Sequence, residues 1–151
     1  HHDIQRSLRA YEVKKYTKKS LYQWIKSTRS DFPNFEIKKI FIDIPKPVLL
    51  KNINSRVDKM FDNGVISEVE KFLKSKISPV NTAYKMIGIL EIRNFLNSSI
   101  DKKRAVELIK IRTRQYAKRQ FTWARGHMQS WERLYDNNLS VLLGKIVKEI
   151  A

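Results

Sequence analysis

The order of apolar and polar residues predicts a chain that is mainly helical. Apolar side chains recur every three or four positions over most of its length, which is the spacing that gathers them on one face of a helix. Leu50, Ile53 and Val57 form such a stripe, and Pro47 just before them is typical of a first helical turn. The pattern predicts helices at residues 3–19, 21–27, 47–63, 67–74, 83–96, 101–125 and 139–150, a loop at 78–82 and a short element around Trp131.

Only one segment is typical of a β-strand. Residues 35–44 are rich in β-branched and aromatic side chains, alternate in part, and are followed by Pro45 and Pro47. A single strand of this length cannot form a sheet, and both of its edges would be exposed. The pattern therefore predicts a fold that is mainly α with one strand, and it indicates that a part of the fold is missing.

The longest predicted helix, 101–125, contains neither Pro nor Gly. Asp101 is a suitable cap at its start, and Gly126 is typical of a helix end. At about 100° per residue, one face of this helix is nearly neutral and suits packing against a core. That face holds Ala105, Val106, Ile109, Thr113, Tyr116, Ala117, Gln120 and Trp123.

Two basic flanks border this neutral face. One carries Arg114, Lys118 and Arg125, and the other carries Arg112 and Arg119. A helix that is only solvated would show the same charges. The stretch 113–125 also interleaves Gln, Thr, Tyr and Trp, which can hydrogen-bond to sugar and base edges and stack on exposed bases. This mixture of side chains favours an RNA-binding helix.

The whole chain is strongly basic. Its 31 Lys and Arg residues against 15 Asp and Glu give a net charge of +16, so its surface attracts polyanions. Nucleic acid is the first candidate partner. A membrane surface is the competing candidate, but no segment approaches the roughly 20 apolar residues of a span, and the basic residues are spread over several elements. We therefore expect no membrane partner.

Size and composition predict one domain without disulfides or metal. The 151 residues, 42% of them hydrophobic, suit a single domain at 1–151, with a helical entry segment at 1–27, a core strand at 35–44 and a helical part at 47–151. Cys is absent, and the only His residues are too few and too scattered for a zinc site. No leader is recognisable, which predicts a cytoplasmic location. Of these histidines, His1 and His2 fit a tag remnant, and the third is His127.

Separate stretches of the chain resemble, in the same order, the C-terminal half of the tRNA dimethylallyltransferases, also called tRNA isopentenyltransferases. The first follows the family pattern D-x-Q-R-x-x-R-A-x-E-V and departs from it only at Tyr11, where Leu is usual. The second is similar to R-x-x-x-M-x-x-x-G-x-x-x-E-V. The residues that match are Asp3, Gln5, Arg6, Arg9, Ala10, Glu12 and Val13 in the first stretch, and Arg56, Met60, Gly64, Glu68 and Val69 in the second.

Two later stretches carry the resemblance further. Residues 85–91 keep Gly88 and Glu91 of the pattern I-G-Y-[KR]-E, but have Ile89 in place of Tyr and Leu90 in place of a basic residue. The last stretch reproduces T-R-x-x-A-K-R-Q-x-T-W-x-R without a mismatch and is the most specific. Its matching residues are Thr113, Arg114, Ala117, Lys118, Arg119, Gln120, Thr122, Trp123 and Arg125.

The resemblance implies a function in tRNA modification. The family transfers a dimethylallyl group from dimethylallyl diphosphate to the exocyclic amine of the adenosine 3′-adjacent to the anticodon, after flipping that base into a channel. Flipping is physically reasonable because a stacked base hides its amine. The resemblance implies the tRNA anticodon stem-loop as partner. It assigns tRNA binding to Gln5, Arg6, Ser7, Leu8, Arg9, Lys85, Met86, Ile87, Gly88, Ile89, Leu90, Lys118, Arg119, Gln120, Phe121, Thr122, Trp123, Ala124 and Arg125.

Alternatives remain open for several of these side chains. Gln5 and Arg9 lie on the same side of a helix and could clamp one nucleotide, or the first stretch could serve in capping and in surface pairs with Asp3 or Glu12. Trp123 could stack on a base or pack in the core. The guanidinium groups of Arg114 and Arg119 are candidates for the donor's diphosphate, because their geometry suits phosphate oxygens.

The family's catalytic parts have no counterpart in this sequence. The family places its phosphate-binding loop, G-x-x-x-x-G-K-[ST], and its Asp general base in an N-terminal half, whereas the four Gly residues here form no such loop. The resemblance thus implies the C-terminal portion of a P-loop NTPase-like α/β core, lacking the half that binds nucleotide and most of the Mg²⁺ contacts. We expect a fragment or truncated product that needs its N-terminal half, is otherwise monomeric, and holds RNA without catalysing transfer alone.

Two rival interpretations are distinct from this one. Within the family, Ile89 and Leu90 could mark an altered site with changed RNA selection. Outside it, the chain could be a non-catalytic basic helical RNA-binding module, which shares the charge of +16 but predicts no preference for an anticodon stem-loop.

Overall fold

The computed structural model describes residues 3–29, 32–75, 77–78, 80–136 and 138–150. His1 and His2, which fit a tag remnant, lie outside the described residues. The chain forms two compact units, His1–Ile37 and Lys38–Ala151, each with helices of its own. The prediction of one domain at 1–151 is not tested by this division, which concerns compactness and not independent folding.

The first unit is built from two helices, α1 (Ile4–Thr17) and α2 (Leu21–Ser27). Asp3 caps α1 because its Oδ1 accepts a hydrogen bond from the Arg6 backbone N–H at 3.1 Å. Ser20 and Gln23 form a reciprocal capping box at the start of α2. The indole Nε1 of Trp24 donates to Thr17 Oγ1 at 2.9 Å, which ties α2 to the end of α1. Both helices agree with the sequence prediction.

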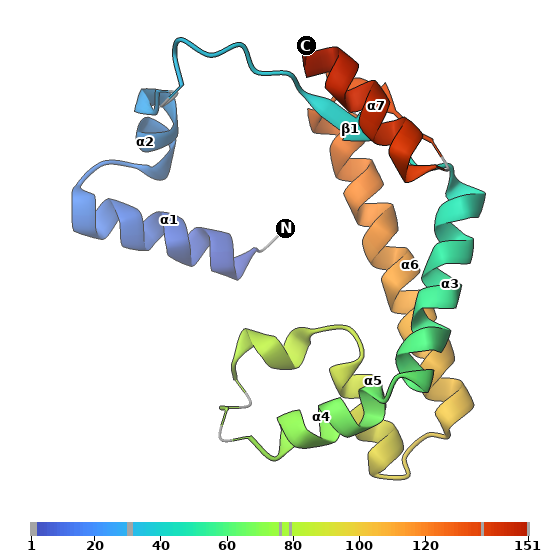
Figure 1. Ribbon diagram of the computed structural model, residues 1–151. Helices are drawn as coiled ribbons and strands as arrows, with labels where there is room; N and C mark the ends of the chain where they lie inside the picture. Colours follow the sequence, from blue (N-terminus) through green and yellow to red (C-terminus); the bar gives the residue numbers. More distant parts are fainter. Residues whose placement is uncertain (1–2, 30–31, 76, 79, 137, 151) are drawn as a thin grey trace. The chain divides into compact units, whose positions relative to one another are not determined.

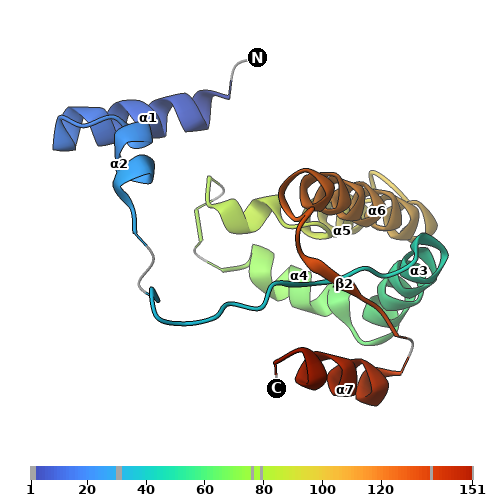
Figure 2. The same cartoon turned by 90° about the horizontal axis from the view of Figure 1, so that it is seen from above.

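The second unit contains two strands and the remaining helices. Figure 1 shows α3 and α6 side by side, with α4 and α5 at one end of this pair and the strands and α7 at the other. Seen from above in Figure 2, β2 follows the end of α6 and leads to α7. The elements in chain order are β1 (Ile40–Ile42), α3 (Lys46–Asp62), α4 (Val65–Leu73), a 3₁₀ turn (Thr82–Lys85), α5 (Ile89–Leu96), α6 (Lys102–His127), β2 (Glu132–Leu134) and α7 (Leu139–Ile150).

The prediction of one strand was wrong, because β1 pairs in parallel with β2. Phe41 stands opposite Arg133 in this pairing, and the Glu132 N–H donates to the Lys39 carbonyl at 2.9 Å. β2 has only three residues, two of them charged, so it has neither the length nor the apolar alternation by which strands are recognised. The predicted strand at 35–44 is likewise reduced to Ile40–Ile42, the part that finds a partner.

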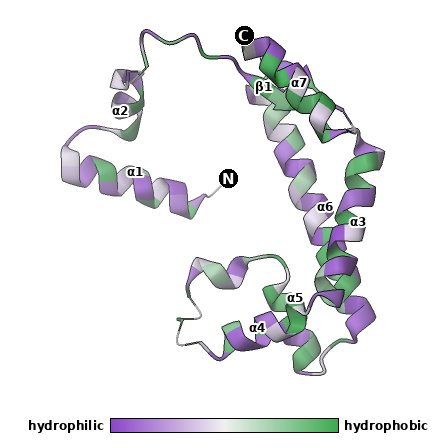
Figure 3. Cartoon of the chain, viewed as in Figure 1, coloured by the Kyte–Doolittle hydropathy of each residue, from purple (hydrophilic) through white to green (hydrophobic). Residues whose placement is uncertain are grey.

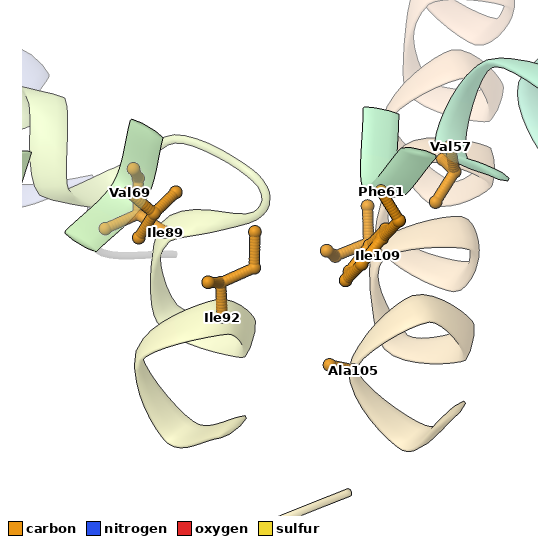
Figure 4. Packing of buried hydrophobic residues seen from close by; sticks show 7 residues of the cluster. All are labelled: Val57, Phe61, Val69, Ile89, Ile92, Ala105 and Ile109. Atoms are coloured by element: carbon orange, nitrogen blue, oxygen red, sulfur yellow. The ribbon is translucent and has the colours of Figure 1, made fainter. Parts of the chain in front are cut away.

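The core of the second unit lies where α3, α4, α5 and α6 meet. Figure 4 shows side chains from these helices directed toward one another, with Ile92 of α5 and Ile109 of α6 among them. Both are almost fully buried, and the small side chain of Ala105 on α6 is also buried. The buried cluster consists of Val57, Phe61, Val69, Ile89, Ile92, Ala105 and Ile109.

Two predicted helix boundaries were wrong. The helix expected at 83–96 is divided into the 3₁₀ turn and α5, because Gly88 adopts φ +108°, a conformation that interrupts a helix and that side-chain-bearing residues rarely adopt. In contrast, Gly126 does not end α6, which continues to His127 and is capped by the Met128 N–H donating to the Ala124 carbonyl at 2.7 Å. A glycine favours the end of a helix when it adopts a left-handed conformation itself, and Gly126 does not have a positive φ.

A carboxyl pair links β2 to α7. The hydrogen bond between Glu132 and Glu149, together with the negative charge of Glu149, raises the pKa of Glu132 above its ordinary value of 4.5, while Lys38 acts in the opposite direction. A carboxyl group whose pKa is raised by folding stabilises the fold below its ordinary pKa. This contribution is lost as the pH rises through the raised value.

We therefore expect the stability advantage of the wild type over Glu132→Gln to be largest in acid and to decline toward neutral pH. Urea unfolding of both proteins at several pH values from about 4 to about 7 measures it, and subtracting the two curves cancels the carboxyl groups that do not interact with Glu132. A difference that stays constant over this range would contradict the hydrogen bond between the two carboxyl groups.

Candidate nucleic-acid interface

The basic helix α6 is oriented by a buried stripe on one side. Asp101 caps it by accepting a hydrogen bond from the Arg104 N–H at 2.6 Å. In its first turns the buried side chains are Ala105 and Ile109. Near its end the inward residues are Phe121, half-buried, and Ala124, buried. Figure 3 shows hydrophilic residues interspersed with hydrophobic ones along α6, and the exposed residues of its second half include Lys118, Arg119 and Arg125. The helix therefore presents its cations outward.

We predicted that the neutral face of this helix packs against the core. This prediction was wrong for the last turns, where Tyr116, Gln120 and Trp123 are exposed. The buried stripe advances by four residues per turn, from Ile109 through the half-buried Thr113, Ala117 and Phe121. This spacing exceeds 3.6 residues, so the inward face drifts around the helix. Phe121 is held inward by an edge-to-face contact with Phe41 of β1, with ring centroids 6.0 Å apart.

Trp123 belongs to the surface of this unit. Its side chain is 54% exposed, and its ring stacks on His127 with centroids 4.6 Å apart and planes 10° from parallel. His127 Nδ1 lies 2.9 Å from the Trp123 carbonyl oxygen, which holds the imidazole in place. Among the described residues, Trp123 is therefore not a core residue, and its ring offers an accessible aromatic surface.

A groove of about 550 Å³ lies beside this part of α6. Its floor is apolar, and Arg119 and Gln120 contribute polar groups to its lining. Such a groove can accept a flat apolar group while an amide and a guanidinium contact its polar edge. The lining residues are Phe41, Ile42, Ile44, Leu49, Ala117, Arg119, Gln120, Phe121, Trp123 and Met128.

The cations of α6 differ in what they contact. Toward its start, Lys110 pairs with Asp58 at 2.6 Å, Arg112 with Glu91 at 2.7 Å and Arg114 with Glu107 at 2.9 Å. Later in the helix, Lys118, Arg119 and Arg125 are exposed, and none of them forms an ion pair within the part of the chain that the structure describes. The Arg119 guanidinium lies 5.7 Å from the centre of the Tyr116 ring.

This division separates the two candidates for a diphosphate contact. Arg114 is engaged by a carboxylate of its own helix, so an anion would have to displace Glu107. Arg119 is accessible beside the groove. Free cations therefore gather at the end of α6 that also carries the exposed Trp123.

The predicted segment 85–90 forms the turn before α5 and the first residues of that helix. Lys85 and Met86 are exposed, Ile87 and Leu90 are half-buried, and Gly88 and Ile89 are buried. Ile89 contributes to the core cluster. The departure from the family pattern at position 89 is therefore a packing difference, whereas Leu90 is the changed position with partial access to solvent.

Residues Gln5–Arg9 occupy α1 in the other unit, and all are exposed. Arg6 pairs with Asp3 at 3.0 Å and Arg9 with Glu12 at 3.6 Å, which are the surface pairs of the alternative interpretation. Exposed pairs of this kind contribute about 0–1 kcal/mol, so a phosphate could replace either carboxylate at little cost. The pairs are therefore compatible with both interpretations.

Sequence reasoning missed several contacts that shape this interface. Phe41 holds Phe121, His127 stacks on Trp123, and Arg112 reaches Glu91 on α5. The four-residue spacing of Trp123 and His127 on one helix was a usable signal for their contact. The other two contacts join residues far apart in the chain, and nothing in the local pattern indicates them.

Two further properties of the described residues bear on partners. No helix within them has the length and apolar character needed to cross a membrane. Among the same residues, no group of three or more His, Asp or Glu side chains is placed to hold a metal ion.

Comparisons with known proteins agree on one family. The sequence pattern of the family described as IPP transferase matches residues 1–127. The tRNA dimethylallyltransferase of Pelagibacter ubique is 47% identical over 146 residues, covering 97% of this chain and 47% of that protein. The tRNA dimethylallyltransferase of Rickettsia massiliae is 38% identical over 129 residues, covering 84% of this chain and 35% of that protein.

A solved structure supports the same assignment. The tRNA isopentenylpyrophosphate transferase of Staphylococcus epidermidis superimposes with a TM-score of 0.69 at 31% identity, covering 98% of this chain and 48% of that one. The chain spans about half the length of these relatives, or less, and the region that it matches is their C-terminal part. The predicted family resemblance is therefore confirmed, and the chain belongs to the IPP transferase family.

Proposed function

We propose that this chain supplies the tRNA-binding surface of a tRNA dimethylallyltransferase. The reaction is the transfer of a dimethylallyl group from its diphosphate to the exocyclic amine of the adenosine 3′-adjacent to the anticodon. The names of its relatives support this assignment, because the Pelagibacter and Rickettsia proteins are both tRNA dimethylallyltransferases. In this proposal the anticodon stem-loop is the partner, and donor chemistry depends on residues beyond these 151.

The observation that carries the proposal is the free, cationic end of α6. Lys118, Arg119 and Arg125 are exposed without ion pairs in the described part of the chain, and they lie in the same last turns of α6 as the accessible ring of Trp123. Phosphates bind such cations, and an unstacked base binds an aromatic surface. A loop of RNA offers both at once, whereas a continuous duplex keeps its bases stacked.

In this proposal the chemical step of the transfer takes place on another part of the enzyme. Mg²⁺ and the phosphate-binding loop belong to the proposed N-terminal part of a P-loop NTPase-like core, and the residues of this chain hold and orient the RNA. The parallel pair β1 and β2 is compatible with such a core, because parallel sheets are usually covered on both faces and extended by further strands. We propose that the complete enzyme works in the cytoplasm as a monomer.

Competition binding tests the proposal against a plain basic module. We expect an anticodon stem-loop to displace a labelled stem-loop from the 151-residue chain more effectively than a fully paired hairpin of equal length. The preference should persist from about 50 to about 200 mM salt, because stacking and hydrogen bonds to bases are less sensitive to salt than phosphate contacts.

The two RNAs carry the same number of phosphates, so charge alone predicts equal competition. Equal competition at every salt concentration, with a steep loss of affinity for both RNAs, would support the non-catalytic module and contradict the proposed function.

A further inference from the structure

We propose that Glu91 is a positioning residue that fixes the turn 85–88 to α6, so that the two RNA-binding segments of the second unit, 85–90 and 118–125, keep one geometry. The inference rests on the proposed function. Glu91 is 1% exposed and is the only buried charged side chain among the described residues. It therefore cannot touch RNA itself, and any effect on binding must pass through its neighbours.

A buried carboxylate is costly unless its oxygens are engaged, and Glu91 engages both. Its Oε2 accepts a hydrogen bond from the Gly88 N–H at 2.9 Å. Its Oε1 lies 2.7 Å from Arg112 Nε but has no hydrogen bond of good geometry, so this second contact is an ion pair. One side chain thus joins a loop backbone to a helix cation.

The contact with Gly88 controls the shape of the turn. Gly88 precedes α5 with φ +108°, and having no side chain it cannot cap the helix in the usual way. Glu91, three residues later, supplies the half of a capping box that remains. The direction in which the chain leaves the turn, and with it the placement of the exposed Lys85 and Met86, depends on this hydrogen bond.

The contact with Arg112 relates the turn to the RNA-binding end of α6. Arg112 is 46% exposed and lies on the same helix as Lys118, which is about 9 Å further along the helix axis at 1.5 Å per residue. A continuous helix transmits position rigidly over that distance. The link Gly88, Glu91, Arg112 therefore sets the spacing between Lys85 on the turn and Lys118 on the helix.

A double-mutant cycle distinguishes positioning from general stability. Gln at position 91 has one oxygen for two donors, so Glu91→Gln must weaken one of the two contacts. We expect Lys85→Ala to lower stem-loop affinity about tenfold in the wild type, as for a lost hydrogen bond to a charged group. In the Glu91→Gln background the same change should cost less than about twofold, because the two sites are coupled.

Lys118→Ala is the matched control, since it removes one lysine from the helix and not from the turn. Its loss of affinity should be the same with Glu91 or Gln at position 91. General destabilisation would instead change the loss of affinity caused by both lysine replacements to the same extent. Arg112→Gln is a second test variant. It keeps the hydrogen bond between Gly88 and the buried Glu91 carboxylate but removes the ion pair that joins Glu91 to α6. Equal costs of Lys85→Ala in the wild type and in both variants would overturn the inference.

Amide hydrogen exchange at Gly88 tests the link without RNA. We expect faster exchange in Glu91→Met, which removes both acceptor oxygens, and no change in Glu70→Met, the same replacement at an exposed carboxylate paired with Lys74. Unchanged exchange at Gly88 in Glu91→Met would overturn the inference even if RNA binds. Loss of stem-loop preference in the wild type, with faster Gly88 exchange in the variant, would instead contradict only the proposed function.

Discussion

Replacing Lys118, Arg119 and Arg125 together by glutamine is expected to lower the affinity for an anticodon stem-loop by at least about 100-fold, given the cost of each lost contact to a phosphate. The three cations are exposed and lack ion pairs in the described part of the chain, so their removal leaves no buried charge behind. The slope of log affinity against log salt should fall by about two to three, at 0.7–0.9 per phosphate contact. Titration of labelled stem-loop at several salt concentrations measures both quantities.

The matched control removes the same charge from another part of the same unit. Lys46, Lys51 and Lys71 are exposed lysines outside the predicted site, and their joint replacement by glutamine preserves the total charge change. We expect this control to weaken binding only through long-range attraction. If the two triple variants lose affinity equally, binding follows net charge and the assignment of the end of α6 as the interface is wrong.

Ile92→Ala is expected to lower the free energy of unfolding by about 2–5 kcal/mol, the range for large-to-small changes at fully buried sites. Ile92 is 0% exposed and lies where α5 meets α6 (Figure 4). Its truncation leaves a cavity that helices held on all sides can fill only in part. Urea unfolding followed by circular dichroism measures the loss.

An exposed leucine provides the comparison for this change. Leu139 at the start of α7 is 69% exposed, and Leu139→Ala should change stability by less than about 0.5 kcal/mol, as is usual for surface substitutions. A loss at Ile92 no larger than at Leu139 would show that the core is not centred between α5 and α6. Stem-loop affinity of the folded Ile92→Ala protein should stay close to wild type, because Ile92 does not reach the surface.

The helices were predictable because their signals are local. The stripe Leu50, Ile53 and Val57 and the proline before it are read within one segment, and α3 begins and ends within about one residue of the prediction. The same holds for the presence of cations and aromatic residues near the end of α6, which the motif places together on one helix. Family membership followed from such segments as well, because motif residues are recognised by their identity at a fixed spacing within one segment.

Other features depended on contacts between distant segments. β2 is too short and too polar to be recognised as a strand from its own residues. It forms because Glu132–Leu134 pairs with Ile40–Ile42, although four α-helices separate the two segments in the sequence. Likewise, the exposure of Trp123 depends on the drift of the buried stripe toward Phe41, and the ordinary helical period predicted the opposite face. The pairing of Arg112 with Glu91 removes one cation of the predicted basic flanks from the free cations.

By itself, then, the amino-acid sequence determined the helical segments, the excess of positive charge and the family, since each rests on residue identity at short spacing. Only the tertiary structure decided which cations remain free, which aromatic ring is accessible and how the turn before α5 is held. The physical reason is that these properties depend on which groups from other elements supply a carboxylate, a ring or a hydrogen-bond acceptor at contact distance. Such partners are brought together by packing, which short-range patterns do not encode.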